Sequence, residues 1–300
     1  MMTTWDKAQA RSLPALTTTL VLALLAVVLL AGCGTGQPGG QTSSSSSPAP
    51  VSTTTTASPT PVSTMTPTAP KSGVMLRWEA PAQVELTASG SPRVLIDVWG
   101  PSMLSAPPTA DDILLTTHTH EDHMSYEFTE SFPGTQLFVR EGAIEQPGVE
   151  IWAIAAAHTQ GDPLVPEGGT DYIFVIDIGG LRIGHFGDIG QPALTPEQAK
   201  AVGHVDIAIT QFENSYSAID AINKKGFRLM EQVKPRLIIQ THSSLAAVKY
   251  AATLWPVMYS KRPSVTLTAA RMPKKTSLLL LGDEGALYIE SGVHARKVHW

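Results

Sequence analysis

Short apolar runs recur along the chain from residue 93 onward, and polar residues, glycines and prolines separate them. Runs of four to eight residues rich in Val, Ile and Leu are typical of buried β-strands. They predict strands at Arg93–Val98, Ile113–Thr117, Gln136–Val139, Glu150–Ala155, Tyr172–Ile178, Leu181–Phe186, Val205–Thr210, Arg236–Thr241, Ser277–Leu281 and Leu287–Glu290.

Helical signals lie between the later strands. Residues 195–198 read Thr-Pro-Glu-Gln, the pattern of a capping box with proline at the first helical position, and Gly203 is suited to end that helix. Apolar residues at helical spacing predict a second helix from Ala218 to Val233, and a third is predicted from Ser244 to Trp255. The patterns alone therefore predict a mixed α/β domain.

The first 72 residues have a different character. Lys7 and Arg11 precede an uninterrupted apolar stretch from Leu20 to Ala31. This stretch is shorter than the roughly 20 residues that cross a bilayer, so residues 1–32 are predicted to be a signal peptide. The segment Leu30-Ala31-Gly32-Cys33 resembles a bacterial lipobox, whose cysteine is lipidated and begins the mature chain. An uncleaved membrane-tethering helix is the alternative, and either reading predicts an extracytoplasmic protein attached to the cell membrane.

Residues 33–72 are predicted to form a disordered tether. No charged residue occurs between Gly34 and Pro70, where Ser, Thr, Pro and Gly dominate, so the segment has too few apolar side chains to offset its ordering entropy. Residues 73–300 are long enough for a single domain with a substantial core. Because Cys33 is the only cysteine, no intramolecular disulfide can form.

The charge balance argues against a nucleic-acid partner. The formal net charge is −5, and the signal segment contributes +1 through Asp6, Lys7 and Arg11, so removing it leaves −6. A protein that binds nucleic acid is expected to present a basic face instead.

A dense group of polar residues follows the predicted strand at 113–117. It reads His118-Thr119-His120-Glu121-Asp122-His123. Imidazole nitrogens and carboxylate oxygens are ligands that zinc and similar divalent cations prefer, and without a metal three adjacent protonated histidines would repel one another. A solvated, histidine-rich loop is the alternative, but the position at a strand end favours a metal site.

The motif resembles the His-x-His-x-Asp-His signature of the metallo-β-lactamase superfamily. The resemblance implies an αββα sandwich with a site at one edge between two sheets. It also implies that His118 and His120 join a distant histidine on one metal, whereas Asp122 and His123 join another distant histidine on a second. A further aspartate would bridge the two metals.

Three downstream residues are candidates for these later ligands. His158 follows the strand predicted at 150–155, Asp188 closes a Gly-Asp pair after the strand at 181–186, and His242 ends the strand at 236–241. A structural histidine and a turn-capping aspartate are the alternative interpretations. His185 is expected either to orient a metal ligand or to be a half-buried strand residue. Three further histidines, at positions 204, 294 and 299, are expected to face solvent.

Within the superfamily, the chain is similar to the branch of ascorbate phosphate lactonases and N-acyl phosphatidylethanolamine phospholipase-D-like enzymes. Residues 93–97, Arg-Val-Leu-Ile-Asp, resemble that branch's Leu-Ile-Asp-Pro strand, with Val98 in place of proline. The branch's early Gly-His pair is absent. Its later Gly-Gly element is replaced by Gln211-Phe212-Glu213-Asn214, which makes Glu213 and Asn214 candidates for substrate contact.

The resemblance implies a metal-dependent hydrolase that uses a metal-bound hydroxide on an ester, lactone or phosphodiester of a small-molecule or lipid-derived substrate. Two divalent ions are implied, with zinc the first expectation and manganese or iron the alternatives. Asp122 and Asp188 are the candidate catalytic residues. A β-lactam-hydrolysing enzyme and a non-enzymatic metal-binding or sensing lipoprotein are the alternative functions.

Overall fold

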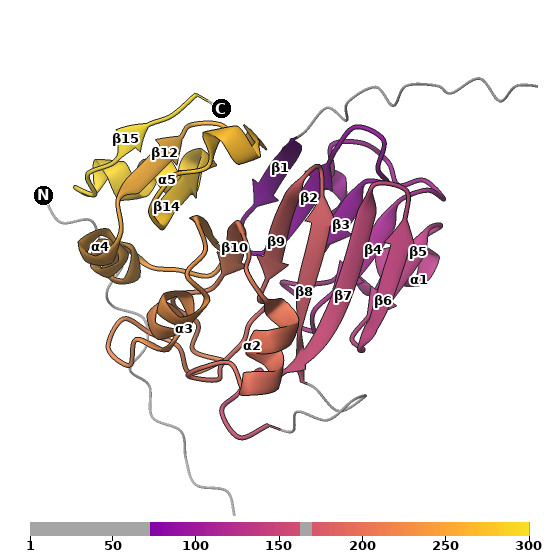
Figure 1. Cartoon of the computed structure of the whole chain (residues 1–300), viewed down its shortest axis with the longest axis horizontal. Helices are drawn as coiled ribbons and strands as arrows, with labels where there is room; N and C mark the ends of the chain where they lie inside the picture. Colours follow the sequence, from indigo (N-terminus) through magenta and orange to yellow (C-terminus); the bar gives the residue numbers. More distant parts are fainter. Residues whose placement is uncertain (1–72, 163–169, 300) are drawn as a thin grey trace, which may run out of the picture. The chain divides into compact units, whose positions relative to one another are not determined.

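The computed structural model describes residues 73–162 and 170–299 (Figure 1). The predicted signal peptide, the tether and the lipidation site Cys33 lie outside these residues and stay predictions. In the described part of the chain, no helix combines the length and the hydropathy needed to cross a membrane.

Two β-sheets form the centre of the fold. In the first sheet the strand order is β13 (Ser264–Leu267), β1 (Val74–Glu79), β2 (Gln83–Thr87), β3 (Val94–Ile96), β4 (Ile113–Thr116) and β5 (Thr135–Phe138). In the second the order is β15 (Arg296–Lys297), β12 (Val257–Ser260), β14 (Ser277–Leu281), β11 (Leu237–Gln240), β10 (Ile207–Thr210), β9 (Leu181–His185), β8 (Asp171–Ile178), β7 (Val149–Ala156) and β6 (Gly142–Gln146).

Helices cover the outer faces of these sheets. The α-helices are α1 (Tyr126–Ser131), α2 (Pro196–Val202), α3 (Lys225–Val233), α4 (Leu245–Leu254) and α5 (Gly282–Glu290). Short 3-10 helices lie at Pro101–Met103 and Ala269–Arg271. The arrangement is the αββα sandwich that the resemblance implies, so the predicted fold class is confirmed (Figure 1).

Side chains of β8 contribute to two separate hydrophobic clusters because they alternate between the two faces of the strand. Phe174 and Ile176 point into the cluster between the two sheets, whereas Ile173 and Val175 belong to the cluster under the helices. Successive side chains of a strand point to opposite faces, so a strand covered on both sides must be apolar throughout. This is why residues 172–176 of β8 form an unbroken apolar run.

One predicted strand is wrong. Residues 287–290 lie inside α5, whereas every other predicted strand overlaps an observed one. Gly282 has a φ of 62° immediately after β14, which turns the chain, and acidic side chains in the first turn suit a helix N-terminus. Gly285 then packs closely against Leu280, so the apolar residues cover the sheet from outside instead of extending it.

The second predicted helix begins later than expected, at Lys225 instead of Ala218. Ala218 and Lys224 have left-handed φ values of 51° and 60°, which no α-helix accepts. The Asp220 carboxylate accepts the backbone N–H groups of Ile222 and Asn223, and such local bonds compete with helix formation. Ile222 is exposed and does not share the buried face of the helix.

The other two predicted helices are confirmed. The capping box at Thr195 and Gln198 is present in α2, and Ser244 caps α4 by accepting the N–H of Ala247. Elements not expected from the sequence are β1, β2, β6, β12, β13, β15 and α1.

The inter-sheet core predicts contrasting effects for two neighbours on β1. Leu76 is fully buried between the sheets, whereas the adjacent Met75 is exposed on the opposite face. We expect Leu76→Ala to lower the free energy of unfolding by about 2–5 kcal/mol, because it leaves a cavity in the core. Met75→Ala is the matched control and should cost less than about 1 kcal/mol. Urea unfolding followed by circular dichroism measures both, and equal losses would contradict the assigned register.

Candidate metal centre

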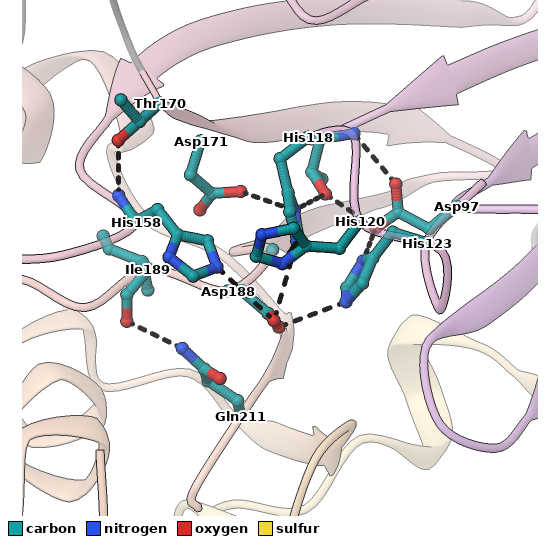
Figure 2. A network of polar contacts seen from close by, with 12 residues as sticks. Asp97, His118, His120, His123, His158, Thr170, Asp171, Asp188, Ile189 and Gln211 are labelled. Carbon is teal, nitrogen blue, oxygen red and sulfur yellow. Dashed lines mark hydrogen bonds and ion pairs between the residues drawn. The ribbon is translucent and has the colours of Figure 1, made fainter. Parts of the chain in front are cut away.

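Strand ends bring the predicted ligands to one edge of the sandwich. His158, Asp188 and His242 follow β7, β9 and β11 in the second sheet. β9, β10 and β11 are parallel, and β7 runs in the same direction because β8 is antiparallel to both β7 and β9. The carboxyl ends of these strands therefore lie at the same edge, and the loop after β4 of the first sheet meets them there (Figure 2).

A first group contains His118, His120, His158 and Asp188, and one potential ligand atom from each lies within 4.8 Å of all the others. The His118 Nε2 and His120 Nδ1 atoms are 3.1 Å apart. His118 and His158 are buried, whereas His120 is exposed. The first group is thus closed on the side of the core and open on the side of His120.

A second group contains Asp122, His123 and His242, whose potential ligand atoms satisfy the same limit of 4.8 Å. His123 Nε2 is 3.0 Å from His242 Nε2, and His242 Nε2 is 3.5 Å from Asp122 Oδ2. His123 is fully buried, whereas the Asp122 side chain is 44% exposed. The seven predicted ligands thus divide into two groups, and the motif residues are distributed between them as the resemblance implies.

Asp188 is a member of the first group and also faces the second. Its Oδ2 atom is 3.7 Å from His118 Nε2 and 3.9 Å from His158 Nε2. Its Oδ1 atom is 3.3 Å from His123 Nε2 and 3.6 Å from His242 Nε2. One carboxylate oxygen therefore faces each group, which is the geometry of a bridging ligand.

These separations fit the size of a metal ion. Two ligands on a tetrahedral zinc, each about 2.0–2.1 Å from the ion, lie about 3.3–3.4 Å apart. The distances around Asp188 and between the paired imidazoles spread on both sides of that value. In addition, His158 Nε2 and Asp188 Oδ1 are buried without a hydrogen-bond partner. A cation in each group would satisfy both atoms, so the residues fit two ions.

A sequence profile describing the beta-lactamase superfamily domain matches residues 76–242, which include all seven residues of the two groups. The chain belongs to the beta-lactamase superfamily. Membership in this hydrolytic superfamily, together with the His/Asp groups, indicates a metal-dependent hydrolase. No curated protein matches the sequence significantly.

Solved structures show the same fold. A protein from Thermotoga maritima, classed by inference as a Zn-dependent hydrolase of the metallo-β-lactamase superfamily, is 20% identical over 70% of this chain and 98% of its own, with a TM-score of 0.52. The metallo-β-lactamase fold protein YhfI from Bacillus subtilis is 11% identical over 69% of this chain and 96% of its own, with a TM-score of 0.46. Isothiocyanate hydrolase from Delia radicum gut bacteria is 14% identical over 70% of this chain and 97% of its own, with a TM-score of 0.44. At such identities the likeness concerns the fold alone, and the lactonase and phospholipase-D-like branch stays a prediction.

The superfamily site in this chain contains four histidines whose pKa is lowered, which favours the neutral form that can bind a metal. Burial lowers the pKa of His118 to about 4, and the nearby His123 adds to that effect. Burial and the nearby His118 likewise lower the pKa of His158 to about 4. Burial also lowers the pKa of His120 and of His242. These four imidazoles are therefore neutral at pH 7 and can offer a lone pair to a cation.

His123 is the exception because two carboxylates face it. Burial acts to lower its pKa, but Asp97 and Asp188 outweigh burial and hold the pKa well above that of an exposed histidine. The histidines hold the pKa of Asp188 far below its usual range despite burial. In the protein without metal, His123 is therefore an imidazolium paired with carboxylates, and a cation that binds Nε2 would replace a proton there.

Asp97 and Thr117 lie on the buried side of the two groups and contact their histidines. Neither residue was among those predicted for the site from the sequence. His123 Nδ1 lies 2.9 Å from Asp97 Oδ2, and the Thr117 hydroxyl donates to the same oxygen at 2.9 Å. Thr117 Oγ1 is also 2.9 Å from His118 Nδ1. The signal was present in the resemblance of residues 93–97 to a Leu-Ile-Asp strand, because Asp97 directly follows β3, which pairs in parallel with β4.

The two predicted substrate contacts are differently placed. The buried Asn214 donates from Nδ2 to Asp188 Oδ2 at 2.6 Å, so its amide is directed at the bridging carboxylate. The Glu213 carboxylate accepts a hydrogen bond from Ser244, the N-cap of α4. The loop then continues to Tyr216, whose side chain is 77% exposed and whose ring centroid is 5.9 Å from that of His120. Substrate contact by Glu213 and Asn214 stays a prediction.

His185 does not belong to either group. It is fully buried, its Nδ1 accepts the Gly187 N–H at 3.3 Å, and its Nε2 has no hydrogen-bond partner. Of the two expectations, the buried strand residue comes nearer, although His185 is more deeply buried than expected. The histidines at 204, 294 and 299 are exposed, as expected.

The buried His185 predicts a loss of stability in acid. Burial lowers its pKa from 6.5 to about 4, so between these pH values the unfolded chain binds the proton and the folded protein does not. Its contribution to stability is therefore complete above about pH 6.5 and disappears as the pH falls toward 4. Asparagine at this position keeps an acceptor near Gly187 but does not titrate.

We expect metal-free His185→Asn to lose about 2 kcal/mol less unfolding free energy than the wild type between pH 7 and pH 5. Urea unfolding in the presence of a chelator measures this difference. His204→Asn, at an exposed position, is the matched control. A wild-type pH dependence in His185→Asn would contradict the assignment.

Proposed function

We propose that the protein is a hydrolase with two divalent metal ions in one site, which cleaves an ester, lactone or phosphodiester bond in a small-molecule or lipid-derived substrate. The observation that carries the proposal is the position of Asp188, which presents one oxygen to each of two ligand groups. Zinc is the expected metal because the two groups offer imidazole and carboxylate ligands.

The exposure of the two groups favours catalysis over metal storage. His118, His123 and Asp188 are buried, whereas His120 and Asp122 reach solvent on the opposite side of the same groups. Structural zinc sites are closed by four protein ligands, whereas catalytic sites leave a position open for water or substrate. Bound divalent ions would supply positive charge that polarises the scissile group and makes a bound water more acidic.

The residues of the chain have distinct roles in this proposal. Asp188 holds the two groups at a fixed separation, and Asn214 fixes the orientation of its carboxylate through Oδ2. Asp122 is on the open side with Oδ2 3.5 Å from His242, so it can orient an attacking water as well as bind metal. Tyr216 stands beside His120 at the solvent side, where a substrate would enter.

The test combines metal content with hydrolysis. The purified protein should bind about two equivalents of zinc and hydrolyse bis-p-nitrophenyl phosphate or a simple lactone, and a chelator should remove both properties. Asp188→Ala should bind fewer ions and lose at least about 100-fold in kcat/KM, because both groups lose a shared ligand. Asp111→Ala, at an exposed position near β4, is the matched control. Full activity of Asp188→Ala would reject the proposal, and turnover of a chromogenic β-lactam alone would favour the alternative enzyme.

We further propose that the catalytic domain is attached to the outer side of the cell membrane through a lipid on Cys33. The support is the apolar stretch at 20–31, the lipobox-like residues before the cysteine and the uncharged segment 34–70 that follows it. The long polar segment would separate the hydrolase from the membrane surface.

In a bacterial host, the full chain should incorporate labelled palmitate and sediment with membranes. Cys33→Ala should lose the label and leave the membrane fraction, because the lipid is the proposed anchor. Membrane retention of an unlabelled Cys33→Ala protein would instead support an uncleaved tethering helix.

A further inference from the structure

Asp171 is a buried carboxylic acid that the proposed mechanism does not yet use. It is the first residue of β8, opposite Ala156 at the end of β7, and none of its surface is exposed. Neither carboxylate oxygen has a hydrogen-bond partner of ordinary geometry. A buried polar group without partners costs free energy, so its presence at the floor of the site requires a reason.

The surrounding backbone is shaped to admit this carboxylate. Gly187 precedes the bridging Asp188 and has a left-handed φ of 52°. A Cβ atom at that position would lie 2.3 Å from Asp171 Oδ1, so only glycine lets the Gly-Asp turn lie against the acid. Burial, together with Asp188 and Asp97, raises the pKa of Asp171 well above its usual range, while the backbone amide of Asp188 opposes that rise.

Asp171 lies close to a metal-ligand candidate. Asp171 Oδ1 lies 3.4 Å from His118 Nδ1 (Figure 2). The other ring nitrogen, Nε2, faces Asp188 Oδ2 at 3.7 Å and His120 Nδ1 at 3.1 Å, inside the first group. The two ring nitrogens of His118 thus face different neighbours. Nε2 faces the other members of the first group, and Nδ1 faces Asp171.

Thr117 fixes which ring nitrogen carries the proton. Its hydroxyl donates to Asp97 Oδ2, so the oxygen can only accept from His118 Nδ1, 2.9 Å away. His118 therefore carries its proton on Nδ1, between the Thr117 hydroxyl and the Asp171 carboxylate, and leaves the Nε2 lone pair free. The neighbouring Thr170 accepts the backbone N–H of His158 at 2.9 Å, so the start of β8 supports two ligands of the same group.

We propose that Asp171 is a positioning residue for the first metal group, where its Oδ1 atom accepts a hydrogen bond from His118 Nδ1 and holds the ring with Nε2 toward the ion. The inference rests on the proposed two-metal function. A carboxylate that accepts from the far nitrogen of a ligating histidine orients the ring and increases its basicity. The distance of 3.4 Å would shorten when a cation draws electron density from the ring.

A structural role and this positioning role predict opposite changes in stability. If Asp171 served only the fold, its replacement would weaken the metal-free protein. If it serves the metal group, removing a buried carboxyl whose oxygens have no hydrogen bond of ordinary geometry should leave the metal-free protein equally or more stable while metal affinity falls. The two measurements together therefore separate the roles.

The experiment compares wild type, Asp171→Asn and Asp171→Leu, refilled with zinc from the metal-free state. Asparagine keeps the shape and an acceptor oxygen, and leucine removes the acceptor. We expect zinc affinity at the first group to fall at least about 10-fold in the leucine variant and less in the asparagine variant, measured by competition with a chromophoric chelator. Asp177→Asn, at the far end of β8, is the matched control and should bind zinc as the wild type does.

Two further readouts complete the test. The unfolding midpoint of the chelated protein should be unchanged or higher in both Asp171 variants. The visible spectrum of cobalt bound at the first group should change in Asp171→Leu and should stay as in the wild type in Asp177→Asn. Wild-type affinity and spectrum in both Asp171 variants would overturn the inference and leave the two-metal function intact. A loss of metal-free stability that parallels the loss of affinity would also overturn it. Failure of the wild type to bind metal would reject the function and the inference together.

Discussion

The shared carboxylate of Asp188 is the constraint around which the site is built. It is 1% exposed, and His118 lies on one side of it and His123 on the other. In the metal-free protein, Asn214 donates a hydrogen bond to one oxygen of this buried charge, and His123 and His242 lie close to the other. The same arrangement leaves five histidines close together, which is tolerable only because burial keeps most of them neutral. Bound cations would replace these contacts between the carboxylate and the imidazoles with metal–ligand bonds.

The rigidity that such a site requires comes from the two sheets. Ligands follow strand ends, and β8 is packed on both faces by separate hydrophobic clusters. Several polar atoms at this edge are buried without partners, including atoms of Asp171, His158 and Asp188. Each of them costs stability, and the apolar contacts of the sandwich offset that cost. Residues that are unfavourable for the fold therefore gather where the proposed chemistry occurs, as expected of a functional site.

The two sides of the site differ in character. The inner side consists of carboxylates and hydroxyls that orient ligands, such as Asp97 and Thr117, and it is sealed from solvent. The outer side is open at His120 and Asp122 and bordered by Tyr216. The residues that hold the geometry are thus separated from those that could meet a substrate.

The sequence by itself determined the local features. The His118–His123 motif cannot separate because its members are covalent neighbours, and apolar runs before His158, Asp188 and His242 determined that these residues follow strands. Only the tertiary structure brought the distant residues His158, Asp188 and His242 to the motif and placed Asp171 beside His118. It also decided that residues 287–290 are helical and that the loop before Lys225 is not. These outcomes depend on contacts between distant segments and on burial, and no local pattern of side chains encodes either.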